Sequence, residues 1–312
     1  METAMSKKRF YFFCLTVIIP AVILYFSFAT GAEKKIYYLG TYQSVKGNDQ
    51  SAGGILQLFK EIQIIYEKRN HILIELKIYD DMSVVAKDLR NKKIDFFLPG
   101  EKEILHDMIK KYKMIPFLSG STFNMDHDKH CLFVKNSSPY KSLHDTEGKK
   151  LQAVQASDLY YSLRLIIKKN PLEYFENIRF AKNPTSLFYS LALDQCDVIM
   201  VNYHQLIYMK KTNPGPVKDI RELACSEAFP NAPLMHTKAV PEKVLTDFET
   251  FLINMRKDKE LKKYWPLMKS FDYRVYKVTA KDYEPVFRLI EEARKKGWDK
   301  EYKTLLKFSG RQ

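Results

Sequence analysis

The sequence is poor in cysteine, with four in 312 residues, and this limits how far disulfides can support the fold. Cys14 lies in an apolar segment near the beginning, which leaves Cys131, Cys196 and Cys225 for the rest of the chain. In an oxidising compartment an odd number allows one disulfide and one buried thiol. Cys196 precedes an apolar stretch and is expected in the core. If a disulfide forms, Cys131–Cys225 is the pair that we expect.

The sequence also lacks the motifs of common enzymes and of nucleic-acid-binding modules. It contains no G-x-S-x-G, P-loop or H-E-x-x-H motif, no zinc-finger spacing and no RNA-binding aromatic signature. It has neither internal repeats nor low-complexity segments. We therefore predict a protein that is not an enzyme and that uses no cofactor.

No long run of one charge sign is present, although Lys and Arg outnumber Asp and Glu by 51 to 37. The formal net charge is +14, and the lysines are spread along the whole chain. Such a surplus is typical of a lysine-rich solvated surface. It is also compatible with an anionic ligand or membrane surface.

One long hydrophobic run does occur, at residues 10–28, directly after Lys7, Lys8 and Arg9. The small residues at 29–32 follow it. This order indicates a secretory signal peptide over residues 1–32, cleaved before Glu33. The run is also long enough for a retained N-terminal anchor. In both cases we expect the remainder of the chain to be periplasmic or otherwise extracytoplasmic.

The remainder has the composition of a globular protein, with 46% hydrophobic residues overall. Apolar strand patterns alternate with helical stripes in two series, at residues 36–112 and 151–210. This alternation predicts an α/β fold with parallel strands and crossover helices. The chain then returns through a Pro-rich passage at 228–233, so it crosses between two lobes twice. We expect lobe 1 at residues 33–135 and 232–312, and lobe 2 at residues 136–231.

Five phrases in this order carry a resemblance to a known family. They are IDFFLPG at 94–100, YKSLHDTEGKKL at 140–151, QCDVIM at 195–200, FPNAPL at 229–234 and DYEPV at 282–286. Together the chain resembles periplasmic solute-binding proteins of the phosphate/phosphonate/phosphite type, over about residues 35–292. The resemblance implies a two-lobed type 2 periplasmic binding fold of the Venus-flytrap kind. It also implies a monomer that delivers a small-molecule ligand to the permease subunits of an ABC importer.

Four junctions between a strand and a helix are the candidate ligand site. Helix N-termini hold small anions through unpaired backbone N–H groups and the helix dipole, helped by hydroxyl and amide side chains. The candidate residues are Thr41, Tyr42 and Gln43; Pro99, Gly100 and Glu101; Gln155, Ser157 and Asp158; and Asn202 and Tyr203. Ser157 or Asp158 alternatively only caps its helix, and Gly100 alternatively only serves a turn.

The charge of the ligand is less well defined by these residues. A small anionic ligand is expected, but Glu101 and Asp158 would repel a dianion in a partly desolvated site. At 154–158 the chain also lacks the Ser/Thr-rich run of phosphonate binders. A monoanion, a zwitterion or a cationic organic molecule therefore all stay open. Two alternatives are a membrane-anchored sensing receptor of the same fold and a metal-binding receptor that uses His127, His130 and Cys131. We interpret the segment that contains His127, His130 and Cys131 as a solvated loop.

Overall fold

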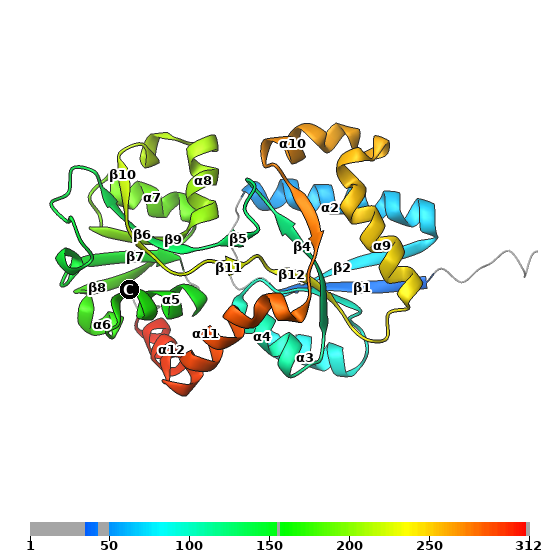
Figure 1. Cartoon of the computed structure of the whole chain (residues 1–312), viewed down its shortest axis with the longest axis horizontal. Coiled ribbons are helices and arrows are strands. Elements are labelled where there is room, and N and C mark those ends of the chain that lie inside the picture. Colours follow the sequence, from blue (N-terminus) through cyan, green and yellow to red (C-terminus); the bar gives the residue numbers. More distant parts are fainter. Residues whose placement is uncertain (1–34, 43–49, 155–156, 310–312) are drawn as a thin grey trace, which may run out of the picture.

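The computed structural model describes residues 35–42, 50–154 and 157–309, and it contains two α/β lobes (Figure 1). The first lobe has a six-stranded sheet of order β13-β4-β12-β3-β1-β2. Its strands are β1 (Lys35–Tyr42), β2 (Ile72–Tyr79), β3 (Phe96–Leu98), β4 (Ile115–Ser121), β12 (Pro233–His236) and β13 (Arg274–Lys277). The second lobe has a five-stranded sheet of order β10-β6-β9-β7-β8. Its strands are β6 (His130–Lys135), β7 (Lys150–Val154), β8 (Asn177–Ala181), β9 (Val198–Asn202) and β10 (Ile220–Cys225).

Helices cover both faces of each sheet, because successive residues of a buried strand point to opposite faces. The helices of the first lobe are α2 (Gln50–Asn70), α3 (Met82–Arg90), α4 (Lys102–Lys110), α9 (Glu242–Asn254), α10 (Trp265–Ser270) and α11 (Glu284–Lys295). Those of the second lobe are α5 (Ser157–Ile167), α6 (Pro171–Tyr174), α7 (Pro184–Ala192) and α8 (Tyr203–Thr212). In β3, Phe96 packs with α2 and α9, whereas Phe97 packs with α3, α4 and α11. In β9, Ile199 packs with α7 and α8, whereas Met200 packs with α5. Short 3-10 turns are η1 (His144–Thr146), η2 (Gly215–Val217), η3 (Met255–Lys257), η4 (Lys259–Tyr264) and η5 (Ala280–Tyr283).

The two series of strands and helices predicted from the sequence form the parallel part of each sheet. β1 pairs in parallel with β2 and β3, and β7 pairs in parallel with β8 and β9. The predicted α/β class and the two lobes are therefore confirmed. Strands β4, β10 and β13 were not predicted, and all three pair antiparallel with their neighbours.

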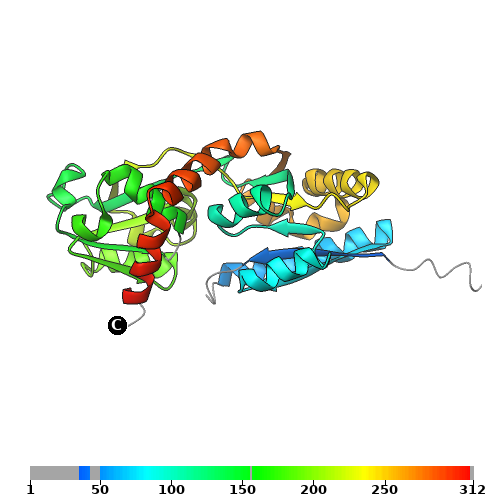
Figure 2. The same cartoon turned by 90° about the horizontal axis from the view of Figure 1, so that it is seen from below.

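Three connections join the lobes, one more than the sequence predicted. Two are the crossing segments β5 (His127–Asp128) and β11 (Phe229–Pro230), which pair with each other between the lobes (Figure 1). The third runs from α11 through Gly297 into α12 (Trp298–Ser309), along one side of the molecule (Figure 2). Gly297 has a φ of +74°, in the left-handed region that glycine adopts without steric cost.

Two segments that were expected in lobe 1 belong to the second lobe in the structure. Residues 130–135 were placed in lobe 1, but β6 pairs with β9 and β10 in the second sheet. Five of its six residues are buried, so this strand needs the cover on both faces that the second sheet offers. Residues 298–309 were also placed in lobe 1, but α12 packs on α5 and β8, where Tyr302 lies against Tyr160 and Phe180.

The expected disulfide is present. Cys131 and Cys225 are facing residues on β6 and β10, and their sulfurs are bonded. Cys196 is a buried free cysteine, and burial first, then Asp197 and Asp194, raises the pKa of its thiol to about 12. This thiol therefore stays protonated and unreactive in the folded protein.

Among the described helices, none has the length and hydrophobicity needed to cross a bilayer. The expected signal peptide or anchor at residues 1–32 lies outside the described part of the chain.

Candidate functional site

The carboxyl ends of β1 and β3 meet at the side of the first sheet that faces the second lobe. The hydroxyl of Thr41 donates a hydrogen bond to the carbonyl oxygen of Leu98, at 3.1 Å. A Cβ atom at Gly100 would lie 2.6 Å from the carbonyl oxygen of Tyr42, so only glycine allows this approach. Pro99 is buried beneath the turn. Four predicted site residues thus lie together here, but the Thr41 hydroxyl is already used within the protein.

The helices that follow bring the two lobes into contact. Glu101 is the N-cap residue of α4, although its side chain makes no capping hydrogen bond. Ser157, the first residue of α5, is 2% exposed, and its hydroxyl lies 3.4 Å from a carboxylate oxygen of Glu101. Two residues that were predicted to bind ligand, one from each lobe, therefore meet at the starts of these helices. Gln43 and Gln155 lie outside the described residues, as does the side chain of Asp158.

Beside this contact lies a pair of basic groups that the sequence analysis did not assign to the site. The ammonium nitrogen of Lys102, at the start of α4, is 3.3 Å from Nε2 of His130. His130 is 1% exposed, and its Nδ1 lies 2.7 Å from the hydroxyl of Ser162 on α5. Lys102 comes from the first lobe, whereas His130 and Ser162 come from the second. The chemistry of this corner is therefore basic and shared between the lobes.

The start of α8 provides a further group of polar side chains. The amides of Tyr203 and His204 donate to the Lys129 carbonyl and to Asp128, so they already have partners. In contrast, Asn202 Oδ1, His204 Nε2 and Gln205 Oε1 are buried atoms without a hydrogen-bond partner. Buried polar atoms are rarely left unpaired in folded proteins. The side chains at this helix, rather than its amides, are therefore the groups suited to a ligand.

Asp128 organises the charges of this region. Burial acts to raise its pKa, but the hydrogen bond from His204 and the positive charges of His204, His130 and Lys102 hold that pKa below its ordinary value. The distance between His204 Nδ1 and the Asp128 carboxylate is 3.1 Å. Asp128 thus stays ionised and orients the His204 ring, with Nε2 on the side away from the carboxylate.

The region around Tyr42 and Glu101, at the end of β1, is acidic. Tyr42 is half-buried, and its pKa is raised first by burial and then by Glu101, Asp81 and Asp80. Three carboxylates therefore act on one phenol at the end of β1. An aromatic ring on which several carboxylates act electrostatically is a favourable environment for a cationic group.

The segment from Asp126 to Cys131 does not form a metal site. His127 is exposed, His130 faces Lys102 and Ser162, and the Cys131 sulfur is in the disulfide. Within the described part of the chain, one group of His, Cys, Asp or Glu side chains has metal-like spacing, and it consists of Cys131, Glu222 and Cys225. The disulfide uses both of its sulfurs, which leaves a single carboxylate.

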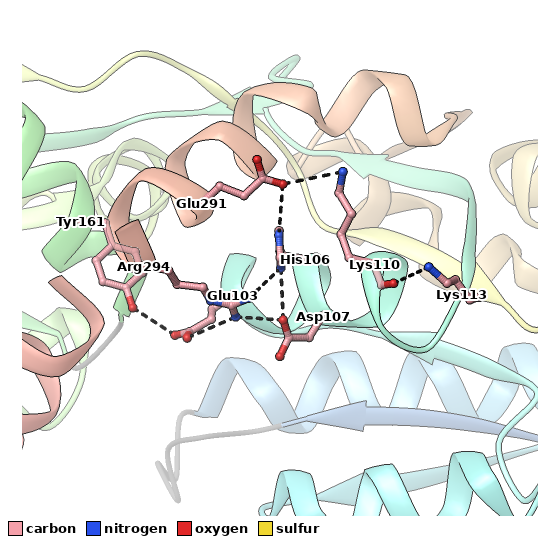
Figure 3. A network of polar contacts seen from close by, with 8 residues as sticks. All are labelled: Glu103, His106, Asp107, Lys110, Lys113, Tyr161, Glu291 and Arg294. Atoms are coloured by element: carbon pink, nitrogen blue, oxygen red, sulfur yellow. Dashed lines mark hydrogen bonds and ion pairs between the residues drawn. The ribbon is translucent and has the colours of Figure 1, made fainter. Parts of the chain in front are cut away.

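A second polar network ties the lobes together (Figure 3). The phenol of Tyr161 on α5 donates to Glu103 on α4, at 3.2 Å. Arg294 on α11 lies 3.6 Å from Glu103 and 2.8 Å from Asp107, and it also contacts His106. We call Tyr161, Glu103 and Arg294 the interlobe network. It joins a helix of each lobe to the third connection.

The structure is similar to several solved binding proteins. It matches PhnD1 from Prochlorococcus marinus in complex with methylphosphonate with a TM-score of 0.63 at 13% identity, over 85% of this chain and 99% of that one. A binding protein component of an ABC phosphonate transporter from Pseudomonas aeruginosa gives a TM-score of 0.61 at 13% identity, over 89% and 99%. The aliphatic sulphonate binding protein SsuA from Escherichia coli gives 0.55 at 13% identity, over 85% and 88%. At these identities the likeness establishes the two-lobed type 2 periplasmic binding fold.

A search of curated proteins found no match. The family model for the periplasmic substrate-binding protein of phosphonate ABC transporters, in contrast, matches residues 49–283. This range includes both sheets except the N-terminal strand β1, and it includes the crossing segments and most of the site. The description of the family also implies an extracytoplasmic location. The chain therefore belongs to the family of periplasmic substrate-binding proteins of ABC phosphonate transporters.

Proposed function

We propose that this protein captures its solute between the two lobes, at the corner where α4 and α5 begin, and presents it to ABC permease subunits as a monomer. The hydrogen bond between Ser157 and Glu101 is the observation that carries this proposal. It brings together the helix starts of two separately folded sheets, and ligands of open α/β sheets bind at such carboxyl-end positions. The residues proposed to line the site are Thr41, Tyr42, Gln43, Pro99, Gly100, Glu101, Lys102, His130, Gln155, Ser157, Asp158, Asn202, Tyr203, His204 and Gln205.

The charge distribution supports a small zwitterion as the ligand. Glu101 and the carboxylates near Tyr42 suit a cationic end. Lys102 and His130, on the side towards β6, suit an anionic end. This arrangement also removes the conflict between Glu101 and an anionic ligand, because the carboxylate would face the ammonium group instead.

A matched ligand pair tests both parts of the proposal. Ethylphosphonate and 2-aminoethylphosphonate differ only in the amine, and each is added to the exported protein while thermal unfolding is followed. A ligand that binds only the folded state raises its stability by about 2.7 kcal/mol at a hundredfold excess over Kd. We expect a larger shift with the amine-bearing compound.

The variant Glu101→Gln separates recognition of the cationic end of the ligand from recognition of its anionic end. It should weaken binding of 2-aminoethylphosphonate by about tenfold or more, and change binding of ethylphosphonate little or improve it. Glu75→Gln, at an exposed position on β2, is the matched control and should behave as the wild type. If neither compound shifts unfolding, and a wider panel of small anions and amines also fails, the proposed capture site is wrong. An equal shift with both compounds would contradict the zwitterion.

A further inference from the structure

The edge of the first sheet that points away from the second lobe is formed by strand beginnings and helix ends. β1 and β2 begin there as a facing pair, Lys35 with Ile72. α2, α3 and α4 each end at this edge, before β2, β3 and β4. β12 also ends there, because His236 faces Phe96 at the start of β3. Figure 2 shows the start of β1 at the end of the first lobe that is remote from the second. We call this surface the distal edge.

The distal edge is lined by exposed basic side chains. They are Lys35, Lys68, His71, Lys92, Lys93, Lys111, Lys113 and Lys238. Acidic groups are fewer. Asp95 is half-buried and accepts a hydrogen bond from the Tyr38 amide, Glu67 is half-buried, and Glu242 is exposed at the start of α9. Asp258 and Glu260 are paired with Arg69 in the last turn of α2. Two exposed isoleucines, Ile36 and Ile115, lie among the lysines. The edge therefore combines positive charge with some exposed apolar surface.

Helix dipoles alone do not explain this charge. The negative end of a helix favours a basic residue in its last turn, which accounts for His71, Lys92 and Lys113 after α2, α3 and α4. It does not account for Lys35 at a strand start or for Lys238 after β12. Neither lysine follows the C-terminus of a helix, so neither compensates the negative end of a helix dipole.

The second lobe offers a comparison with the same architecture. Its corresponding edge, where β7, β8 and β9 begin and α5 and α7 end, carries both signs of charge. The basic residues there are Lys135, Lys149, Lys150, Lys168 and Lys169, and the acidic residues are Asp145, Glu147, Glu173, Glu176, Asp194 and Asp197. Lys169 and Glu147 form an ion pair at 2.7 Å. The same α/β lobe architecture therefore forms without a predominantly basic edge.

We propose that the distal edge docks on an anionic phospholipid surface. An anionic leaflet attracts each basic side chain that lies near it, and the attraction adds up where several are grouped, as they are on this edge. Exposed isoleucines among them add contact with the interfacial region. The hydrophobic run at residues 10–28 precedes β1 in the sequence, and residues 29–34 span at most ~20 Å. A retained run would thus hold the start of β1, at this edge, within about 20 Å of the bilayer.

Lysine footprinting on vesicles tests the proposal without any variant. The exported protein, in the form that its host releases, is acylated with an amine-reactive ester in the presence of phosphatidylcholine vesicles or vesicles with about a third phosphatidylglycerol. We expect Lys92, Lys93 and Lys113 to lose reactivity only with the anionic vesicles. Lys149, Lys150 and Lys168 of the second lobe should not change. The protection should fade as salt is raised above about 0.1 M, where the screening length falls below ~10 Å.

Charge reversal provides the second measurement. K92E/K93E/K113E should lower the partition coefficient onto anionic vesicles by at least about tenfold, whereas K149E/K150E/K168E should lower it much less. Equal losses in both triple variants would show that only total charge matters, and would overturn the proposal. Equal protection of both lysine sets in the footprint, or none on either, would overturn it as well.

Discussion

At the scale of single residues, Asp128 shows how one carboxylate gains its properties from residues far away in the chain. It is 13% exposed, lies on the crossing strand β5 and binds His204, which is 76 residues further on. In the sequence, the segment around it resembles a charged loop. Its partner comes from the start of α8, so no local pattern could reveal the pair. Lys102 and His130 escaped prediction for the same reason.

The low pKa of Asp128 leads to a prediction about stability and pH. Because the folded state holds this pKa below its unfolded value of about 3.9, the stabilisation is complete above about pH 4 and is lost as pH falls through the folded pKa. Asp128→Asn should therefore lower the free energy of unfolding by about 1–3 kcal/mol at pH 7. The difference from wild type should shrink towards pH 3, as measured by urea unfolding across pH.

Asp126→Asn is the control for this experiment, since Asp126 is exposed and lies 4.0 Å from Arg274. It should change stability little at either pH. A constant difference between wild type and Asp128→Asn from pH 7 to pH 3 would contradict the assignment.

At the scale of elements, the sequence predicted best those strands that are buried and flanked by helices. The two series predicted at residues 36–112 and 151–210 form β1, β2, β3, β7, β8 and β9. β4 was missed because Pro116 and Gly120 interrupt its pattern, and the strand is nevertheless held between β12 and β13. β10 and β13 are short edge strands that carry charged residues, Arg221 and Glu222 in β10 and Arg274 and Lys277 in β13. Their pairing depends on partners that only the folded sheet supplies.

The disulfide between β6 and β10 gives a prediction for the second sheet. It links residues 94 apart in the sequence, and loss of such a bond costs about 2–5 kcal/mol. C131A/C225A should lower the free energy of unfolding by this amount, and a reducing agent should have a similar effect on the wild type. Denaturant titration with and without reductant measures both.

Cys196→Ala separates disulfide loss from cavity formation, because Cys196 is buried but unbonded. Its stability should still fall when reductant is added. A wild-type protein whose unfolding does not respond to reductant would show that the bond contributes nothing.

At the scale of the whole molecule, the third connection makes α12 move with the second lobe. Glu301 of α12 binds Tyr160 and Arg164 of α5, and Trp298 lies against Arg164. α11, in contrast, is tied to α4 through Arg294. Gly297 lies between these two helices, where the third connection passes from one lobe to the other.

The interlobe network should therefore influence ligand affinity from a distance. A neutral hydrogen bond contributes about 0.5–1.5 kcal/mol, so Tyr161→Phe should raise Kd by about threefold to tenfold without touching the ligand. Tyr160→Phe removes a similar bond, to Glu301 at 3.1 Å, but within the unit of α5 and α12. It should leave Kd unchanged. Calorimetric titration with ligand measures Kd for both variants. Equal changes in Kd would mean that the network does not couple the lobes.

The sequence by itself determined the α/β class, the two lobes, the choice of disulfide partners and the family, because these depend on local periodicity, residue type and the order of short phrases. The tertiary structure alone decided that β6 and α12 belong with the second sheet. It alone also decided that Ser157 meets Glu101 and that Lys102 meets His130. Such contacts depend on sheet order and on the relative orientation of two lobes, and these are set by the packing of whole faces rather than by any stretch of sequence.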